Sequence, residues 1–193
     1  PNASVTFEEL NSLGIKCKKS GGFVLAGGIK SFSQIYKART FKSAYLYLGS
    51  CTEAELPQKF ASLDGKLAQR LNVNNYRLEV EGVSHQKRLE IIPKCTGVLK
   101  SFINTPSAYS FEIKLKVTPE RIIMLLNPLG DKRFAYRRKA VSASVAPSVA
   151  ASVCRFCSKY FAPEARVLDN FCGSGTMLFE RSFYPHGPLT GVD

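Results

Sequence analysis

The sequence predicts a mixed α+β chain whose last part begins a separate α/β domain. Three observations lead to this fold class. Short strands and helical stretches are interleaved over the first 130 residues, and near residue 170 a strand end runs into a turn with two glycines and then a helix. The excess positive charge is confined to the part before that turn. The two parts therefore differ in both charge and pattern.

The first fifty residues predict the order helix, strand, strand, helix, strand. Thr6 followed by Glu9 is typical of a helix start, because both side chains satisfy free backbone amides, and Gly14 ends this helix. This order is that of a ferredoxin-like βαββαβ unit without its first strand. We expect such a unit over residues 1–50, with the missing strand ahead of the first residue. The expected segments are a helix from residue 6, strands at 15–18 and 23–26, a helix at 31–38 and a strand at 44–48.

Residues 51–130 predict a second small α+β unit. The stretch 111–117 alternates charged and apolar residues, which is typical of a strand with one buried face, and 121–126 is more uniformly apolar, as in a more buried strand. Gly65 is expected to interrupt the first helix of this unit. The expected segments are helices within 53–71 and 87–102 and strands at 76–80, 111–117 and 121–126.

The charge is distributed unevenly along the chain. The net charge is +12, and 23 of the 27 Lys and Arg but only 11 of the 15 Asp and Glu lie up to Lys139. A one-sided basic region favours contact with a polyanion such as nucleic-acid phosphates. A solvated basic surface without a ligand would have the same composition.

The predicted linker over residues 131–148 carries the densest basic run, interleaved with two aromatic residues. Cations neutralise phosphates and aromatic rings stack on unpaired bases, although the same rings would also pack in an ordinary linker. We therefore expect RNA contacts from Lys132, Arg133, Tyr136, Arg137, Arg138 and Lys139.

The six cysteines are scattered, which indicates reduced thiols. Cys154-x-x-Cys157 is the one pair with metal-ligand spacing, but no second such pair accompanies it, so we expect no metal site. No apolar run is long enough for a bilayer and no signal peptide is visible, so a cytoplasmic protein without a membrane partner is expected. Cys157 is expected on the buried face of a helix marked by the apolar spacing of Val149, Val153, Phe156 and Tyr160.

The glycine turn is the best candidate for a binding site. Gly173 and Gly175 allow a ligand to approach the backbone closely, because glycine lacks a Cβ and adopts unusual φ angles. A second predicted strand, 189–193, ends in an acid 24 residues after Asp169, similar to the Rossmann acid that binds ribose hydroxyls. The expected cofactor-binding residues are Asp169, Phe171, Cys172, Gly173, Gly175 and Asp193.

This turn resembles the cofactor motif of S-adenosylmethionine-dependent RNA methyltransferases, Asp-Pro-Phe-Cys-Gly-x-Gly-Thr, with Asn170 in place of the proline. The resemblance implies a Rossmann-like methyltransferase domain that starts at residues 149–193 and is incomplete here, with S-adenosylmethionine as cofactor. It further implies that Asp169 shapes the pocket near the methionine part and that Asp193 holds the adenosine ribose.

The layout of residues 51–130 resembles the THUMP region of RNA-modifying enzymes. The preceding unit resembles the ferredoxin-like element that accompanies THUMP, through the stretch 22–27 and Arg39. This second resemblance implies structured RNA, tRNA or rRNA, as the partner.

Together, these features indicate part of an enzyme that transfers a methyl group to a base nitrogen of RNA, guanine N2 in particular. The Asn/Asp-Pro-Pro-aromatic motif of that family does not occur here, so the catalytic residues are expected beyond Asp193 and the partial chain is expected to be inactive alone. The alternative is a non-catalytic RNA-binding protein with a methyltransferase remnant. A dinucleotide-dependent oxidoreductase is a weaker reading, because the third glycine is missing. The sequence does not indicate the oligomeric state.

Overall fold

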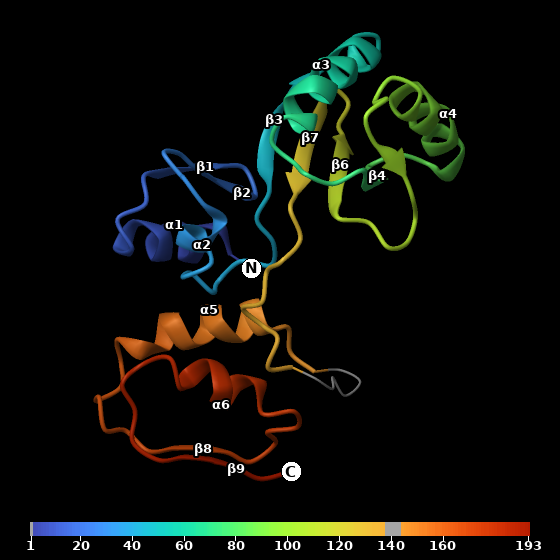
Figure 1. Cartoon of the computed structure of the whole chain (residues 1–193). Helices are drawn as coiled ribbons and strands as arrows, with labels where there is room; N and C mark the ends of the chain where they lie inside the picture. Colours follow the sequence, from blue (N-terminus) through green and yellow to red (C-terminus); the bar gives the residue numbers. More distant parts are fainter. Residues whose placement is uncertain (1, 138–143) are drawn as a thin grey trace. The chain divides into compact units, whose positions relative to one another are not determined.

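The computed structural model describes residues 2–137 and 144–193 (Figure 1). The chain divides into two compact units. The terminal unit combines residues 1–44 and 131–193, and the sheet unit comprises Tyr45–Gly130. The sheet unit is thus inserted between two segments that fold together.

A five-stranded mixed sheet with the strand order β3-β7-β6-β4-β5 organises the sheet unit. Its central strands β4 and β6 run parallel, which requires a crossover, and α4 supplies it. Strand β7 pairs antiparallel with β6 and with β3. The elements are β3 (Leu46–Cys51), α3 (Leu56–Ala68), β4 (Asn75–Glu81), α4 (His85–Thr96), β5 (Ile103–Asn104), β6 (Phe111–Val117) and β7 (Ile122–Asn127).

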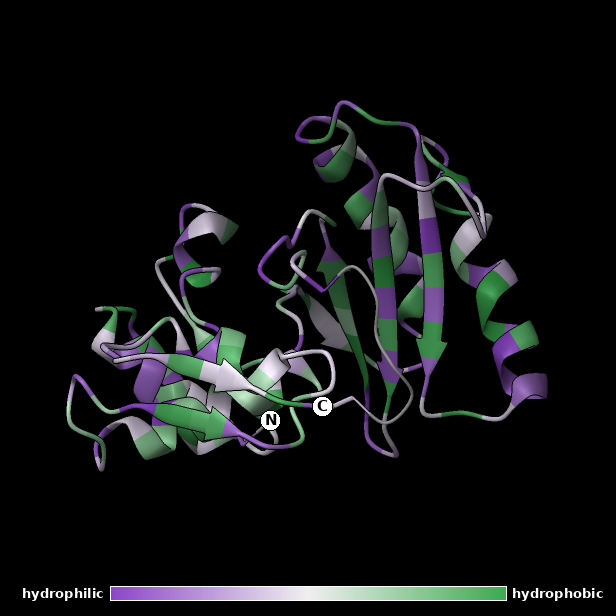
Figure 2. Ribbon diagram, turned by 90° about the horizontal axis from the view of Figure 1, so that it is seen from below, coloured by the Kyte–Doolittle hydropathy of each residue, from purple (hydrophilic) through white to green (hydrophobic). Residues whose placement is uncertain are grey.

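The core of the sheet unit lies between one face of this sheet and the helices α3 and α4. Figure 2 shows hydrophilic and hydrophobic residues alternating along its strands, so that one face is apolar. Helix α3 continues through Gly65 without a break, because the buried residues of its apolar face pack on the sheet. The largest fully buried side chains of this core include Phe60, Tyr76, Ile91, Phe111 and Met124.

The terminal unit begins with a helix and a hairpin of antiparallel strands. Helix α5 packs against both α1 and α6, and a parallel pair of strands, β8 and β9, follows. No helix in the described part of the chain is long and apolar enough to cross a bilayer. The elements are α1 (Ala3–Ser12), β1 (Cys17–Ser20), β2 (Phe23–Ala26), α2 (Phe32–Ile35), α5 (Pro147–Ser158), β8 (Val167–Asp169), α6 (Thr176–Arg181) and β9 (Leu189–Gly191).

The strand expected to close the ferredoxin-like unit lies elsewhere. The first four elements follow the predicted order, but β3 joins the five-stranded sheet and pairs with β7 from Leu46↔Leu126 to Cys51↔Ile122. The free edge of β7 offers a row of unpaired backbone groups, and β3 satisfies them. The prediction that this strand completes the unit at residues 1–50 is therefore wrong.

The buried face of α5 also differs from the prediction. Its apolar stripe is exposed, with Phe156 56% and Tyr160 68% accessible. Small residues allow helices to approach closely, and they face α1 and α6 instead. Cys154, rather than Cys157, is the buried thiol of this helix. The buried residues of α5 are Ser148, Ala150, Ala151, Ser152 and Cys154.

Candidate functional site

The parallel strands β8 and β9 are joined through α6, and their register brings two acids to one edge. Val167 pairs with Leu189 and Asp169 with Gly191. The carboxyl ends of parallel strands meet at the same edge of a sheet, where ligands bind in open α/β folds. Asp169 ends β8, and Asp193 follows β9 by two residues. The predicted acids are thus brought to the edge from which the glycine turn emerges.

The glycine turn has a backbone that requires its glycines. Gly173 has φ 49° and Gly175 has φ 68°, both in the left-handed region. Gly175 is also the N-cap of α6. The turn is tied to β9, because the amide of Cys172 donates to the carbonyl of Val192 at 3.0 Å. This main-chain bond holds the turn against the segment that follows β9.

Each of the two acids accepts a hydrogen bond from the turn. Oδ1 of Asp193 accepts from the amide of Gly173 at 3.2 Å. Oδ1 of Asp169 accepts from the amide of Phe171 at 3.1 Å. These bonds orient the carboxylates beside the glycines.

Gly191 also determines the shape of the site, although its sequence context did not single it out. A Cβ added there would lie 2.7 Å from Sγ of Cys172 and 2.8 Å from Cδ1 of Leu178. A side chain at this position would force Cys172 or Leu178 to shift, so glycine allows the close approach of β9 to the turn and α6. Cys172 faces this close contact, so its side chain supports the turn from the strand side.

The face of the turn beside Gly175 is open. A Cβ added at Gly175 would meet no described atom within 4 Å, and the ring of Phe171 is 90% exposed. Backbone amides, two carboxylates and an exposed aromatic ring are the groups that contact a nucleoside-bearing ligand. The groups present are therefore of the kinds that fit the adenosine-containing cofactor that the family resemblance implies.

Behind the turn, α6 carries a buried carboxylate. The side chain of Glu180 has no solvent exposure. Its Oε2 accepts from Nε of Arg39 at 2.7 Å, and its Oε1 accepts from Nη2 of Arg39 at 2.9 Å and from the hydroxyl of Tyr136 at 2.6 Å. A buried carboxylate with three charge-assisted or hydroxyl donors is fully compensated. We call Arg39, Tyr136 and Glu180 the Glu180 cluster.

The structure places two of the expected RNA-binding residues inside the terminal unit. The side chain of Arg133 is only 3% exposed, pairs with Asp131 at 2.6 Å and lies 3.7 Å from the ring centroid of Phe41. Tyr136 stacks on Phe179 with centroids 3.7 Å apart. Arg133 and Tyr136 are therefore structural residues here, and their expected RNA contacts are not supported, because each group is already used within the unit.

The other members of the basic run differ in accessibility. Lys132 is exposed. Arg137 is partly buried, and its Nε has no hydrogen-bond partner among the described residues. Arg138 and Lys139 lie outside the described residues. Within the described part of the run, Lys132 is thus accessible to a phosphate and Arg137 is partly accessible.

The cysteine pair of α5 does not form a ligand set. Sγ of Cys154 donates to the carbonyl of Met177 at 3.7 Å, and burial raises the pKa of Cys154 to about 11. Across residues 2–137 and 144–193, no group of His, Cys, Asp and Glu is arranged to hold a metal ion.

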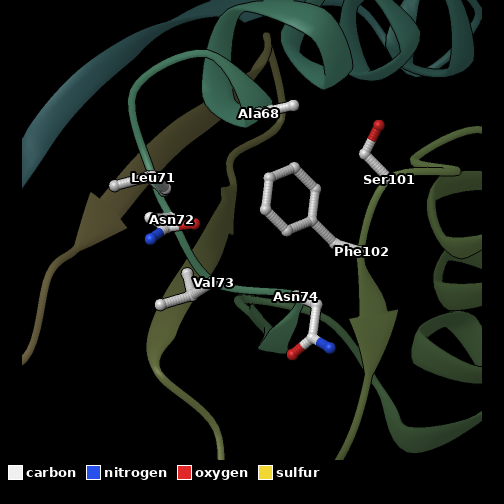
Figure 3. Close-up of a pocket in the computed structure, with 7 residues that line it drawn as sticks. All are labelled: Ala68, Leu71, Asn72, Val73, Asn74, Ser101 and Phe102. Atoms are coloured by element: carbon white, nitrogen blue, oxygen red, sulfur yellow. The ribbon is translucent and has the colours of Figure 1, made fainter.

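The sheet unit contains a shallow hollow, shown in Figure 3, between the end of α3 and the strand β5. The ring of Phe102 points in among its lining residues (Figure 3), and none of the residues expected to bind cofactor or RNA lines it. The lining residues are Ala68, Leu71, Asn72, Val73, Asn74, Ser101 and Phe102.

Comparison with known proteins places this arrangement among solved structures. No family model and no curated protein match the chain. A predicted N6-adenine-specific DNA methylase from Listeria monocytogenes is similar with a TM-score of 0.73 and 18% identity, over 94% of this chain and 52% of that one. TrmN from Thermus thermophilus is similar with a TM-score of 0.74 and 17% identity, over 98% of this chain and 61% of that one.

A third similar structure is SMU.472, described as a methyltransferase and solved as a complex with SAH. Its TM-score is 0.65 at 19% identity, over 94% of this chain and 52% of that one. At this identity the likeness is one of fold, and the chain spans between half and two thirds of the length of the three structures. The chain therefore has the fold of one part of these proteins.

Proposed function

We propose that this chain is part of an RNA methyltransferase that uses S-adenosylmethionine. The reaction would transfer a methyl group to a base nitrogen, guanine N2 of tRNA or rRNA in particular. When bound, the cofactor supplies an electrophilic methyl group. The residues of this chain would bind and orient it, and the groups that handle the acceptor base are expected outside this chain.

One observation carries the proposal: Asp193 accepts from the amide of Gly173 at 3.2 Å, at the edge where β8 and β9 end. This bond uses Oδ1, so Oδ2 of the same carboxylate is the natural acceptor for ribose hydroxyls. Asp169, on the neighbouring strand, would lie toward the methionine part. The likeness in fold to a methyltransferase complexed with SAH supports this choice of cofactor over a nicotinamide dinucleotide.

The RNA part of the proposal rests on charge. Most cationic residues precede Ala140, and the later part of the chain is balanced. Lys132, Arg137 and the neighbouring Arg138 and Lys139 are the residues of the basic run that we propose for phosphate contacts. Phosphate contacts position a nucleic acid without reading its sequence, so the identity of the modified nucleotide would come from other parts of the protein.

Calorimetric titration of the full-length protein with SAH tests the cofactor assignment. The variant Gly173→Val should lose measurable SAH binding, because a β-branched side chain cannot adopt φ 49° without strain and would distort the turn. The matched control is Gly22→Val, since Gly22 has an ordinary φ and a Cβ there meets nothing within 4 Å. RNA binding, measured by electrophoretic mobility shift, should be unchanged in both variants.

An unchanged SAH affinity in Gly173→Val contradicts the site assignment. RNA binding by a wild-type protein that takes up no SAH would instead favour the alternative, a non-catalytic RNA-binding protein.

A further inference from the structure

The helix that follows the glycine turn is short and is held near its far end by the Glu180 cluster. Helix α6 spans six residues from Thr176 to Arg181, directly after the turn. Glu180 is therefore only one helical turn from the residue that follows Gly175. A helix this short has few hydrogen bonds of its own. Its orientation depends on what its side chains contact.

Arg39 provides the strongest of these contacts. Its guanidinium makes two hydrogen bonds to the Glu180 carboxylate in a fork, and a fork fixes direction as well as distance. The same guanidinium lies 3.8 Å from the ring centroid of Phe183, just beyond α6. Arg39 thus holds both the last turn of α6 and the residues that follow it.

The backbone around Arg39 is itself anchored. Oε2 of the buried Glu9, on α1, accepts from the amides of Arg39 and Thr40, both at 2.9 Å. The hydroxyl of Thr6, also on α1, donates to the carbonyl of Thr40 at 3.1 Å. Both Ala38 and Thr40 are fully buried. The guanidinium of Arg39 therefore projects from a fixed segment.

Tyr136 fixes α6 from a second side. Its hydroxyl donates to Glu180, and its ring stacks on Phe179 of the same helix. Nη2 of Arg39 also donates to the carbonyl of Arg133 at 3.0 Å, so the segment with Tyr136 is tied to the same guanidinium. Three stretches distant in sequence meet at one carboxylate.

We propose that Arg39 is a positioning residue for the glycine turn. It acts through Glu180, which fixes α6 and hence the direction of the amides of Gly173 and Gly175. Tyr136 assists from the second side. The consequence for cofactor affinity rests on the function proposed above, whereas the consequence for the order of the turn does not.

Hydrogen–deuterium exchange of the full-length protein tests the positioning directly. In Arg39→Met, exchange of the amides in residues 170–181 should rise about tenfold, as expected when a buried pair is broken. Exchange in α1 and in the sheet unit should stay at the wild-type rate. Arg39→Lys, which keeps the charge but loses the fork, should restore part of the protection.

The matched control is Arg155→Met. Nη2 of Arg155 donates to Oγ of Ser12 at 2.9 Å and ties α5 to α1, and its side chain also interacts with Tyr184, three residues beyond α6. This variant should leave the exchange of residues 170–181 unchanged. The proposal is wrong if Arg39→Met leaves that exchange unchanged, or if Arg155→Met raises it equally.

A milder variant keeps the test decisive if Arg39→Met unfolds. Tyr136→Phe removes one hydrogen bond to Glu180 but leaves the Arg39 fork in place, and it should raise exchange in α6 less than Arg39→Met. If Tyr136→Phe leaves exchange in residues 170–181 at the wild-type rate, the cluster does not position the turn.

SAH titration of the same variants separates the two proposals. If the wild type binds SAH, Arg39→Met should bind it about tenfold more weakly, and Arg39→Lys should fall between the two. If the wild type does not bind SAH, the proposed function fails, while the exchange data still decide whether Arg39 positions the turn.

Discussion

Arg39 and Glu180 form a buried two-bond ion pair although 141 residues separate them in the chain. The carboxylate side chain has no exposure and that of Arg39 is 14% exposed. Burial by itself would lower the pKa of Arg39, but the hydrogen bonds and charge of Glu180 outweigh it and hold that pKa above its ordinary value. The hydrogen bonds from its guanidinium to Glu180 therefore favour the charged form of Arg39.

Glu180→Gln should destabilise the protein by about 3 kcal/mol, because it leaves the guanidinium of Arg39 buried without its counter-charge. Glu8→Gln is the matched control. Glu8 is exposed on α1, so that change should stay within about 0.5 kcal/mol of wild type. The free energy of unfolding in urea measures both, and equal values for the two variants would show that the pair contributes nothing.

Removing the hydroxyl of Tyr76 and removing that of Tyr136 should have different effects on the stability of the protein. The hydroxyl of Tyr76 is buried in the core of the sheet unit and has no hydrogen-bond partner among the described residues, while that of Tyr136 donates to Glu180 at 2.6 Å. Tyr76→Phe should therefore leave stability unchanged or raise it by up to about 1 kcal/mol, because an unpaired buried polar group is costly. Tyr136→Phe should lower stability by about 1–2 kcal/mol. Thermal unfolding measures both, and a large loss in Tyr76→Phe would contradict the unpaired assignment.

Gly191→Ala should destabilise the β8–α6–β9 segment by about 1–3 kcal/mol, because the new methyl would meet Cys172 and Leu178 at less than 3 Å. Gly27→Ala is the control in the same unit, since a Cβ there meets nothing within 4 Å. Adding Cys172→Ala to Gly191→Ala should recover part of the loss. If Gly191→Ala unfolds at the same midpoint as the wild type, the close approach of Gly191 to Cys172 and Leu178 is contradicted.

The buried thiol of Cys154 should make the protein less stable at alkaline pH. Burial raises its pKa from the ordinary value of 9.0 to about 11 in the folded chain. The unfolded chain releases the thiol proton first, so this contribution is intact below pH 9 and declines as the pH rises from 9 to about 11. The free energy of unfolding should fall by no more than about 1.4 kcal/mol per pH unit over this range.

The measurement is urea unfolding of wild type and Cys154→Ala at several pH values. The difference between the two free energies of unfolding should narrow above pH 9. A difference that is constant up to pH 11 would argue against a buried, protonated thiol.

Local patterns in the sequence were sufficient for most of the elements. The strand 111–117 and the strand–turn–helix at the glycines lie where predicted, because alternation and glycine placement are set by neighbouring residues. The partner of β3 was not predictable in this way, since its alternating pattern suits any free sheet edge. The buried face of α5 was also missed, because small residues carry a weak hydrophobic signal although they allow the closest packing.

The sequence by itself determined the charge asymmetry, the order of the elements and the glycine turn with its flanking acids, Asp169 and Asp193. These depend on composition and on short-range backbone preferences. Only the tertiary structure decided that Arg133 and Tyr136 pack inside the terminal unit and that Arg39 pairs with Glu180. Contacts between residues so far apart in the chain depend on how α1, α5 and α6 pack. The sequence of a basic run is the same whether its charged side chains are paired within the protein or free to bind a ligand.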